Sequence, residues 1–336
     1  MSTETKQFKA MRVEERQEGD KLAYSSSIVT RELDALPEGE VLVKVQYSSL
    51  NYKDALSASG NKGVTRNYPH TPGIDAAGIV QSSSVDTYAT GDAVIITGYD
   101  LGMNTDGGFA EYVRVPAAWL VRLPDGLSAY ESMVLGTAGL TAALCVDKLL
   151  KAGLTPDAGA VLVTGATGGV GSVAVALLAQ LGFAVTAATG KAEAADFLRS
   201  LGATSIIDRQ ELLEENPRPL LKERWAGVVD VVGGPVLWNA VKALRYGGSV
   251  ALCGLVGSPS LDASVFPFIL RGVNLLGVDS VNVPQPLKSQ MWQRLATDWK
   301  LTQLDALAQT VALEELETKL NGLLAGKGKG RMVLAL

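Results

Sequence analysis

Cysteine and histidine are almost absent from this 336-residue chain, which has two of the first and one of the second. Both cysteines, Cys145 and Cys253, lie inside apolar segments. Two such residues can build neither a disulfide framework nor a thiol metal cluster, so we expect a protein of the reducing cytoplasm. The first residues, Met-Ser-Thr-Glu-Thr-Lys-Gln, lack the apolar core that follows the basic start of a secretory signal, and no such signal is expected.

An excess of positive charge is also missing. The chain carries 30 Lys and Arg against 35 Asp and Glu, which gives a formal net charge of −5. Binding to nucleic acid or to an anionic membrane is therefore not expected. There is no internal repeat and no low-complexity tract. The length and the 47% hydrophobic content fit two domains with large cores, and a small-molecule substrate is expected.

Charge of either sign is missing between Asp157 and Lys191. A run of this length is long enough to cross a bilayer as a helix. Its glycines argue against a membrane span, because they cluster directly after the β-branched run 161–164 and directly before the helix-forming run 172–181. This order predicts a strand, a tight glycine turn and a helix, which Gly182 ends before a second apolar strand. The run is thus typical of a buried βαβ unit, whose strands lack alternation because both faces are covered.

The chain changes character near residue 128. Before it, short strands alternate with turn residues, as in a small β-barrel or sandwich; they are expected at 40–47, 78–80, 92–97 and 109–115. After it, helices alternate with apolar strands, which is typical of a doubly wound parallel sheet; these strands are expected at 161–164, 183–188, 205–207, 228–232, 249–253 and 273–278. The last segment, 328–336, resembles a turn and a strand that rejoins the first domain. We predict an α/β protein with three parts in chain order: 1–128, the inserted domain 129–295, and 296–336.

The glycine turn is the clearest sign of a cofactor. Ala166-Thr-Gly168-Gly-Val-Gly171 matches the Gly-x-Gly-x-x-Gly fingerprint with alanine at the first position, after a strand and at the start of a helix. Backbone amides at such a helix N-terminus bind a pyrophosphate, because they are unpaired donors at the positive end of the helix dipole. We predict dinucleotide contacts from Gly168, Gly169, Val170 and Gly171. The alternative is a packing turn that binds no ligand.

The end of the second strand of this unit indicates which dinucleotide binds. An NAD site places Asp or Glu there to accept a hydrogen bond from the ribose 2′-hydroxyl. This chain has Thr189, Gly190 and Lys191, and a hydroxyl and an ammonium suit a 2′-phosphate. Arg209, after the third strand, adds a second cation if the fold brings it near. NADP(H) is the predicted cofactor, although Lys191 is also consistent with a solvated residue at the start of a helix.

A second architecture shares this turn. Thr164-Gly165-Ala-Thr-Gly168-Gly-Val-Gly171 fits the pattern of short-chain dehydrogenases. Those enzymes carry the turn near the N-terminus and use a Tyr-x-x-x-Lys pair, in which the lysine lowers the pKa of the tyrosine. None of the nine tyrosines here has a lysine four residues later, so this architecture is excluded.

Motifs outside the glycine turn are similar to those of a known enzyme superfamily, and the similarity covers essentially the full chain. They are Asn51-Tyr-Lys-Asp54, Pro72-Gly-Ile-Asp-Ala-Ala-Gly78, Gly107-Gly-Phe-Ala-Glu-Tyr112 and Gly136-Thr-Ala-Gly139. With them the chain resembles the medium-chain dehydrogenase/reductase superfamily. The resemblance implies a Rossmann domain inserted in a GroES-like β-barrel catalytic domain. It also implies a homodimer, paired along the edge strand 273–278.

Zinc members of that superfamily hold a catalytic metal with Cys and His ligands that this chain lacks. Asn51 stands where they carry Cys, and Ile74 stands where they carry His. The single histidine, His70, lies in a proline-flanked loop and is expected at the surface. The four-cysteine structural zinc lobe is missing as well. No metal is therefore expected, and zinc-assisted alcohol dehydrogenation is excluded.

Further strings narrow the resemblance to a zinc-free branch described as acryloyl-CoA reductases or quinone oxidoreductases. They are Leu50-Asn-Tyr-Lys-Asp-Ala-Leu56, Gly136-Thr-Ala-Gly-Leu-Thr-Ala142, Cys253-Gly-Leu255, Pro267-Phe-Ile-Leu-Arg271 and Gly277-Val-Asp-Ser280. The resemblance implies an NADPH-dependent reductase of an activated carbon–carbon double bond. Acryloyl-CoA is the first expectation, and a quinone or enone is the alternative. A cofactor-binding protein without turnover is a third interpretation.

The resemblance also implies roles for single residues. It places Tyr52 at the cofactor, where we expect a polar contact beside the nicotinamide and, as a second role, donation of the proton, with loop packing as the alternative. Asn51 is expected to donate a hydrogen bond in the active site, and Asp54 to hold loop backbone or a nearby cation. Three more residues are brought to the cofactor, with apolar packing as the alternative for the first two: Leu255, Ile269 and Ser280. Five cations are candidates for the phosphates of a CoA thioester: Arg66, Arg271, Lys327, Lys329 and Arg331.

Overall fold

The computed structural model describes residues 7–214 and 216–336, which form two compact units. Unit 1 contains the described residues up to Thr137 together with Val281–Ala296 and Leu304–Leu336. Unit 2 contains Ala138–Ser280 and Thr297–Gln303. The chain therefore leaves the first unit, builds the second and returns, as in the predicted fold class.

Unit 2 is built on a six-stranded parallel sheet in the order β10-β9-β8-β11-β12-β13. The strands are β8 Val161–Val163, β9 Val185–Thr189, β10 Ser205–Asp208, β11 Trp225–Asp230, β12 Leu244–Leu252 and β13 Asn274–Gly277. The helices between them are α3 Gly169–Gln180, α4 Ala195–Ser200, α5 Gly234–Lys242 and α6 Phe266–Arg271, with short 3-10 turns at Pro156–Ala158, Ala192–Ala194 and Arg209–Leu212. Every residue of β8 and β11 is buried, which explains the missing alternation. All six predicted strands are present.

The uncharged run between residues 157 and 191 is therefore β8, α3 and β9 of this sheet. Gly182 follows α3 with a φ of +86°, a left-handed conformation that favours glycine and ends the helix. Leu162 of β8 packs in one buried cluster with Val228 of β11 and Leu237 of α5. The predicted βαβ unit is confirmed.

Helix α2, Ala129–Lys151, carries the chain from unit 1 into unit 2. Gly136 interrupts it with φ 52° and ψ −156°, and the unit boundary follows directly, after Thr137. The predicted boundary at 128 marks the start of the helix, whereas the structural division lies at its kink; the second division lies at Ser280 rather than 295. Among the described helices, α2 alone has the length and apolarity of a membrane span, but 83% of its apolar window is buried inside the protein. It is a core helix.

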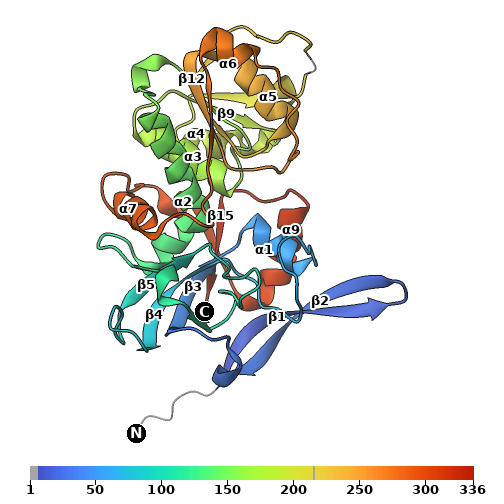
Figure 1. Ribbon diagram of the computed structural model, residues 1–336, viewed down its shortest axis with the longest axis vertical. Helices are drawn as coiled ribbons and strands as arrows, with labels where there is room; N and C mark the ends of the chain where they lie inside the picture. The colour runs from blue at the N-terminus through green and yellow to red at the C-terminus, as the bar shows by residue number, and fades with distance from the viewer. Residues whose placement is uncertain (1–6, 215) are drawn as a thin grey trace. The chain divides into compact units, whose positions relative to one another are not determined.

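Unit 1 contains a seven-stranded sheet in the order β14-β15-β3-β4-β5-β7, with β6 paired to β3. The strands are β3 Val41–Ser49, β4 Asp75–Ser83, β5 Ala93–Thr97, β6 Tyr112–Val115, β7 Leu120–Arg122, β14 Ala308–Val311 and β15 Arg331–Ala335. The helices are α1 Tyr52–Ala58, α7 Gln285–Ala296, α8 Leu304–Leu307 and α9 Leu316–Leu324, with 3-10 turns at Leu33–Ala35, Ala117–Trp119 and Leu313–Glu315. The C-terminal strand β15 lies antiparallel beside β3 (Figure 1), so the predicted return of the chain is confirmed.

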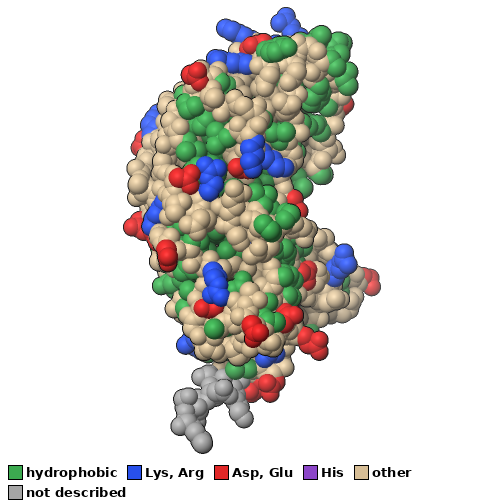
Figure 2. All heavy atoms as spheres, turned by 60° about the vertical axis from the view of Figure 1, so that its left-hand side comes forward, with side chains coloured by type: hydrophobic (Ala, Val, Ile, Leu, Met, Phe, Trp, Pro, Cys, Tyr) green, Lys and Arg blue, Asp and Glu red, His purple; other side chains and the backbone are tan. Residues whose placement is uncertain are grey.

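A long hairpin precedes this sheet and is absent from the sequence prediction. Strands β1, Gln7–Glu18, and β2, Lys21–Glu32, pair antiparallel along their full lengths. Most residues of β2 and the second half of β1 are exposed or half-buried, so the alternation that reveals a strand is weak there. On the face in Figure 2, acidic and basic side chains are interspersed, in keeping with the small net charge.

Candidate functional site

A glycine turn joins β8 to α3 in unit 2. Gly165 has a φ of +56°, and a Cβ atom on Gly171 would lie 2.4 Å from the carbonyl oxygen of Gly165. Both positions therefore need glycine, the first for its conformation and the second for the close approach of helix and turn. Gly168 lies in extended conformation directly before α3, which begins at Gly169.

The first turn of α3 presents free hydrogen-bond donors. In the described part of the chain, the amide groups of Gly169, Val170 and Gly171 have no acceptor, whereas the amide of Ser172 donates to the carbonyl oxygen of Gly168 at 2.9 Å. Three unpaired donors at the positive end of a 12-residue helix are what a pyrophosphate binds. The structure thus brings the predicted fingerprint residues together at one helix end.

The end of β9 lies in the same sheet, next to β8. Thr189 Oγ1 accepts a hydrogen bond from the amide of Lys191 at 3.0 Å. Arg209 packs against Gly190, where an added Cβ atom would lie 2.6 Å from its Nε. Burial lowers the pKa of the Lys191 ammonium, and Glu193 opposes that shift. The fold therefore brings Arg209 to the end of β9, as its predicted role as a second cation requires.

Asp208, the last residue of β10, places a carboxylate beside the end of β9. Asp208 pairs with Thr189 in the parallel register of β9 and β10. Its Oδ1 accepts a hydrogen bond from the amide of Gln210 at 2.8 Å, so the carboxylate caps the 3-10 turn that carries Arg209. The position directly after β9, where an NAD site has its acidic residue, is occupied by Gly190 and Lys191.

The other three predicted cofactor residues lie farther along unit 2. Leu255 follows β12 and Ile269 lies on α6, and their exposures of 64% and 69% show that core packing does not account for them. Ser280 is buried, and its hydroxyl accepts a hydrogen bond from Thr141 Oγ1 at 2.7 Å. In the described part of unit 2, no hydrogen bond joins these three residues to the glycine turn. Their cofactor contacts stay predictions.

Tyr52 is the first residue of α1 in unit 1. Its side chain is 41% exposed, and its hydroxyl has no hydrogen-bond partner in the described part of the chain. A tyrosine that only anchors a loop is expected to be buried with its hydroxyl paired. The phenol is therefore available to a ligand, as its predicted role requires.

Asn51 precedes α1 as its N-cap and is held on every side. Its Nδ2 donates to Asp75 Oδ2 at 2.8 Å and to the carbonyl oxygen of Ser49 at 3.3 Å. Its Oδ1 accepts from Arg331 Nη1 at 3.3 Å, and its backbone amide donates to Asp54 Oδ2 at 2.8 Å. Both side-chain hydrogens are used within unit 1, so this geometry does not support the predicted donation to a substrate.

Asp54 is fully buried and holds loop backbone, as the sequence analysis expects. Its Oδ1 accepts hydrogen bonds from the amides of Gly73 at 3.1 Å and Ile74 at 2.8 Å. Burial, followed by the negative charge of Asp75, raises the pKa of Asp54 to about 7, while the hydrogen bonds from Ile74 and Asn51 oppose the rise. A fully buried carboxyl group that titrates near neutrality thus lies in the first turn of the helix that carries Tyr52.

Asp75 and Arg331 hold the side chain of Asn51 from two sides, as its hydrogen-bond acceptor and donor. The sequence alone does not predict this role for either residue. Asp75 opens β4, and Arg331 opens β15; β3 lies between these strands in the sheet. Both side chains are buried, and burial lowers the pKa of Arg331 while Asp75 and Asp54 oppose that shift. A charged residue at the start of an otherwise apolar closing strand is the signal that could have revealed Arg331.

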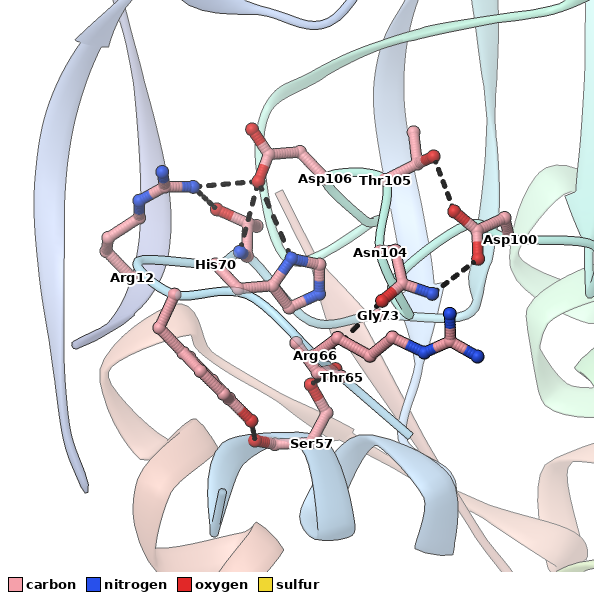
Figure 3. Close-up of polar contacts among 12 residues, drawn as sticks. Arg12, Ser57, Thr65, Arg66, His70, Gly73, Asp100, Asn104, Thr105 and Asp106 are labelled. Carbon is pink, nitrogen blue, oxygen red and sulfur yellow. Dashed lines mark hydrogen bonds and ion pairs between the residues drawn. The ribbon is translucent and has the colours of Figure 1, made fainter. Parts of the chain in front are cut away.

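His70 corrects the prediction of a surface residue. It is 3% exposed, because backbone hydrogen bonds with Val13 of β1 hold its loop against the hairpin. Figure 3 shows its imidazole beside Asp106, with Nδ1 3.9 Å from Oδ1, and Arg12 bound to the same carboxylate at 2.7 Å. Burial lowers the pKa of His70. In residues 7–214 and 216–336, no three His, Cys, Asp or Glu side chains gather as a metal site.

Two of the five candidate cations for CoA phosphates are already used inside the protein. Arg271 donates to the carbonyl oxygens of Lys242, Leu244 and Leu221. Arg331 is 3% exposed, and its guanidinium donates to Ser49 Oγ and Asn51 Oδ1. The three others are exposed: Arg66, Lys327 and Lys329. These remain the candidates for a phosphate.

Two family models match the chain. The model described as alcohol dehydrogenase GroES-like domain matches residues 37–125, within unit 1. The model described as zinc-binding dehydrogenase matches residues 169–298, which include the glycine turn and most of unit 2. The two matches follow the two units in chain order.

Three relatives match nearly the whole chain. The acrylyl-CoA reductase AcuI of Ruegeria pomeroyi is 47% identical over 97% of this chain and 98% of its own. YhfP of Bacillus subtilis, whose name assigns it provisionally to the quinone oxidoreductases, is 47% identical over 93% of this chain and 95% of its own. A solved structure of YhfP contains NAD and has a TM-score of 0.94, with 45% identity and coverage of 98% of this chain and 99% of that one. The YhdH oxidoreductase of Salmonella enterica, solved in complex with NADP, has a TM-score of 0.94 and 43% identity, with coverage of 98% and 99%.

Proposed function

Because this chain belongs to the medium-chain dehydrogenase/reductase superfamily, in the branch of YhdH, YhfP and AcuI, we propose that it is an NADPH-dependent reductase of acrylyl-CoA. The reaction converts acrylyl-CoA, NADPH and a proton into propanoyl-CoA and NADP⁺. The similarity to AcuI over nearly the full chain supports the substrate. The arrangement at the end of β9 supports the cofactor.

The cations at the end of β9 are the observation that carries the choice of NADPH. Arg209 packs on Gly190, Lys191 follows directly, and no acidic residue stands where an NAD site places one. A 2′-phosphate is stabilised there by charge-assisted hydrogen bonds, and a carboxylate would repel it. The amides of Gly169, Val170 and Gly171 bind the pyrophosphate. The complex of S. enterica YhdH with NADP agrees with this assignment, whereas the complex of YhfP with NAD makes a direct comparison of the two cofactors necessary.

The reduction needs a hydride, stabilisation of an enolate and a proton. NADPH, when bound, supplies the hydride to the β-carbon of the thioester. Negative charge then develops on the thioester oxygen, and a proton must reach the α-carbon. We assign the proton to the hydroxyl of Tyr52, which is exposed and has no hydrogen-bond partner among residues 7–214 and 216–336. Asn51 does not contact the substrate in this mechanism, because its side chain is bound to Asp75 and Arg331.

A zinc ion is not part of the proposal, although one matching model is described as a zinc-binding dehydrogenase. The two positions that carry ligands in zinc members hold an amide and an alkyl group here. Both hydrogens of the Asn51 amide are bound within unit 1, and Ile74 is a buried apolar side chain. This donor set does not fit zinc.

Loss of NADPH absorbance during turnover tests the function. Purified protein is assayed with acrylyl-CoA, crotonyl-CoA and a simple quinone, each with NADPH and with NADH. The proposal expects the highest kcat/KM for acrylyl-CoA with NADPH. A preference for the quinone would instead assign the NADPH-dependent quinone or enone reductase suggested by the name of YhfP. Absence of turnover with every acceptor would favour a cofactor-binding protein.

We also propose that the protein is a cytoplasmic homodimer. Strand β13 is an edge of the six-stranded sheet, and the neighbouring segment exposes apolar side chains at Val265, Phe266 and Leu270. Pairing of two β13 strands satisfies their open backbone groups and covers this surface. Light scattering of wild type and Leu270→Asp measures it. A monomeric wild type would contradict the dimer, and a monomer confined to the variant would support it.

A further inference from the structure

Five polar residues of unit 1, three of them buried and two half-buried, form a network beside Tyr52. They come from β3, the start of α1, β4, α2 and β15: Ser49, Asn51, Asp75, Thr137 and Arg331. Ser49 and Asp75 are fully buried, and Arg331 is 3% exposed. Such a network is stable only when its members satisfy one another, since each unpaired polar group would cost free energy.

The carboxylate of Asp75 is the centre of the network. Its Oδ2 accepts hydrogen bonds from Ser49 Oγ at 2.5 Å, Asn51 Nδ2 at 2.8 Å and the backbone amide of Thr137 at 2.9 Å. Its Oδ1 accepts from Thr137 Oγ1 at 2.5 Å. Through Asp75, these hydrogen bonds connect the residue that precedes Tyr52 to Thr137, the last residue of the first segment of unit 1.

Arg331 completes the network from the opposite side. Its guanidinium donates to Ser49 Oγ and to the carbonyl oxygen of Val134, both at 2.9 Å, and to Asn51 Oδ1 at 3.3 Å. The amide of Asn51 is therefore fixed in one orientation, because a flip would turn its NH₂ group toward Arg331 and its oxygen toward Asp75.

Gly136 packs on the same group of side chains. A Cβ atom there would lie 2.5 Å from Ser49 Oγ, 2.6 Å from Asp75 Oδ2 and 3.0 Å from Arg331 Nη2. The kink of α2 and the start of α1 thus share one polar support within unit 1.

We propose that Asp75 and Arg331 are positioning residues of the reductase, which hold Asn51 so that the first turn of α1 presents Tyr52 in its reactive orientation. The inference rests on the proposed function of Tyr52. Neither residue touches substrate in this scheme, since Asp75 and Arg331 are buried and their polar atoms face other residues of unit 1. A small displacement of a group that transfers a proton lowers the rate of the chemical step far more than the binding of NADPH, whose predicted contacts outside Tyr52 lie in unit 2.

Steady-state kinetics of Asp75→Asn, Asn51→Ala and their double variant test the proposal. We expect kcat for acrylyl-CoA to fall roughly 10- to 100-fold in each single variant, while KM for NADPH changes less than about twofold. The double variant should lose no more than the worse single variant, because both substitutions interrupt the same contact. An additive loss, or a kcat equal to that of wild type, would overturn the inference.

Asp106→Asn is the matched control. Asp106 is another largely buried carboxylate of unit 1. It is bound by Arg12 at 2.7 Å (Figure 3) and by Arg31 at 2.6 Å, both on the hairpin, and no hydrogen bond among the described residues joins it to the five network residues. Its loss should lower Tm while kcat stays within about twofold of wild type. A comparable fall of kcat in this control would show that loss of any buried carboxylate slows the enzyme, and positioning would be rejected.

A second pair keeps the test open if Asp75→Asn does not fold. Thr137→Ser keeps the hydroxyl that donates to Asp75 Oδ1, and Thr137→Val removes it. We expect the serine variant to retain kcat and the valine variant to lose it, at similar KM for NADPH; equal kcat in the two would contradict the proposal. The proposed function itself is judged by wild type alone, so its failure is visible before any variant is compared.

Discussion

The side chain of Arg209 lies directly on the backbone of Gly190, so close that a Cβ atom at that glycine would be 2.6 Å from Nε. The contact exists because β10, which Arg209 follows, is the neighbour of β9, which Gly190 follows. It places a guanidinium at the strand end where dinucleotide-binding sheets recognise the 2′ substituent of the adenosine ribose.

Removal of the two cations at this strand end should change the choice of cofactor. In Lys191→Glu and Arg209→Gln, KM for NADPH should rise roughly 10- to 100-fold, since each charge-assisted hydrogen bond to phosphate contributes about 1.5–3 kcal/mol. KM for NADH should change less than about threefold. The measurement is kcat/KM for both cofactors, with Lys222→Gln, an exposed lysine of unit 2, as the control. An unchanged NADPH-to-NADH ratio would show that these cations do not select the cofactor.

Alanine substitutions at two glycines of the turn should have different effects, one on stability and the other on KM for NADPH. Gly171→Ala brings a Cβ atom within 2.4 Å of the Gly165 carbonyl oxygen, so the free energy of unfolding should fall by about 3 kcal/mol. Gly168→Ala meets that oxygen at an ordinary 3.4 Å, and its φ of −78° suits alanine. Its stability should stay within about 0.5 kcal/mol of wild type, while KM for NADPH rises about tenfold because the methyl group faces the pyrophosphate. Urea denaturation and steady-state kinetics separate the two effects, and equal stability of both variants would contradict the steric argument.

Local signals explain why the cofactor half of the site could be predicted. The fingerprint around Gly168 and Gly171 combines conformation, spacing and the order of strand and helix in one continuous segment. Lys191 follows in the same βαβ unit. Arg209 needed one further fact, the adjacency of β9 and β10, which only the fold supplies.

The support of Tyr52 could not be predicted in the same way. Asp75 and Arg331 belong to segments far apart in the chain, and the sheet brings them to either side of β3. His70 illustrates the same limit. Flanking prolines favour an exposed loop, but pairing with Val13 on an unpredicted hairpin buries it. The surroundings of Asp75, Arg331 and His70 depend on pairing between strands far apart in the sequence, which local sequence patterns do not predict.

Asp54 should make stability depend on pH near neutrality. Its pKa rises from 3.8 to about 7 on folding, so the folded state holds the proton more tightly than the unfolded state. The resulting stabilisation is fully present below the unfolded pKa and is lost as pH rises through about 7. In urea denaturation between about pH 5 and about pH 8, the free energy of unfolding of wild type should fall more steeply than that of Asp54→Asn. Parallel pH profiles would show that Asp54 ionises normally in the folded protein.

The hydroxyl of Tyr52 is the last group that the proposed chemistry requires. Tyr52→Phe keeps the ring and removes the proton, so kcat for acrylyl-CoA should fall about a hundredfold or more, with KM for NADPH within about threefold of wild type. Because the hydroxyl has no partner among the described residues, Tm should not change. Tyr88→Phe is the control: it removes the hydrogen bond from a buried tyrosine of unit 1 to the Leu120 carbonyl oxygen, which should lower Tm and leave kcat intact. If Tyr52→Phe retained full kcat, the proton would have to come from solvent, and Tyr52 would be reduced to a binding contact.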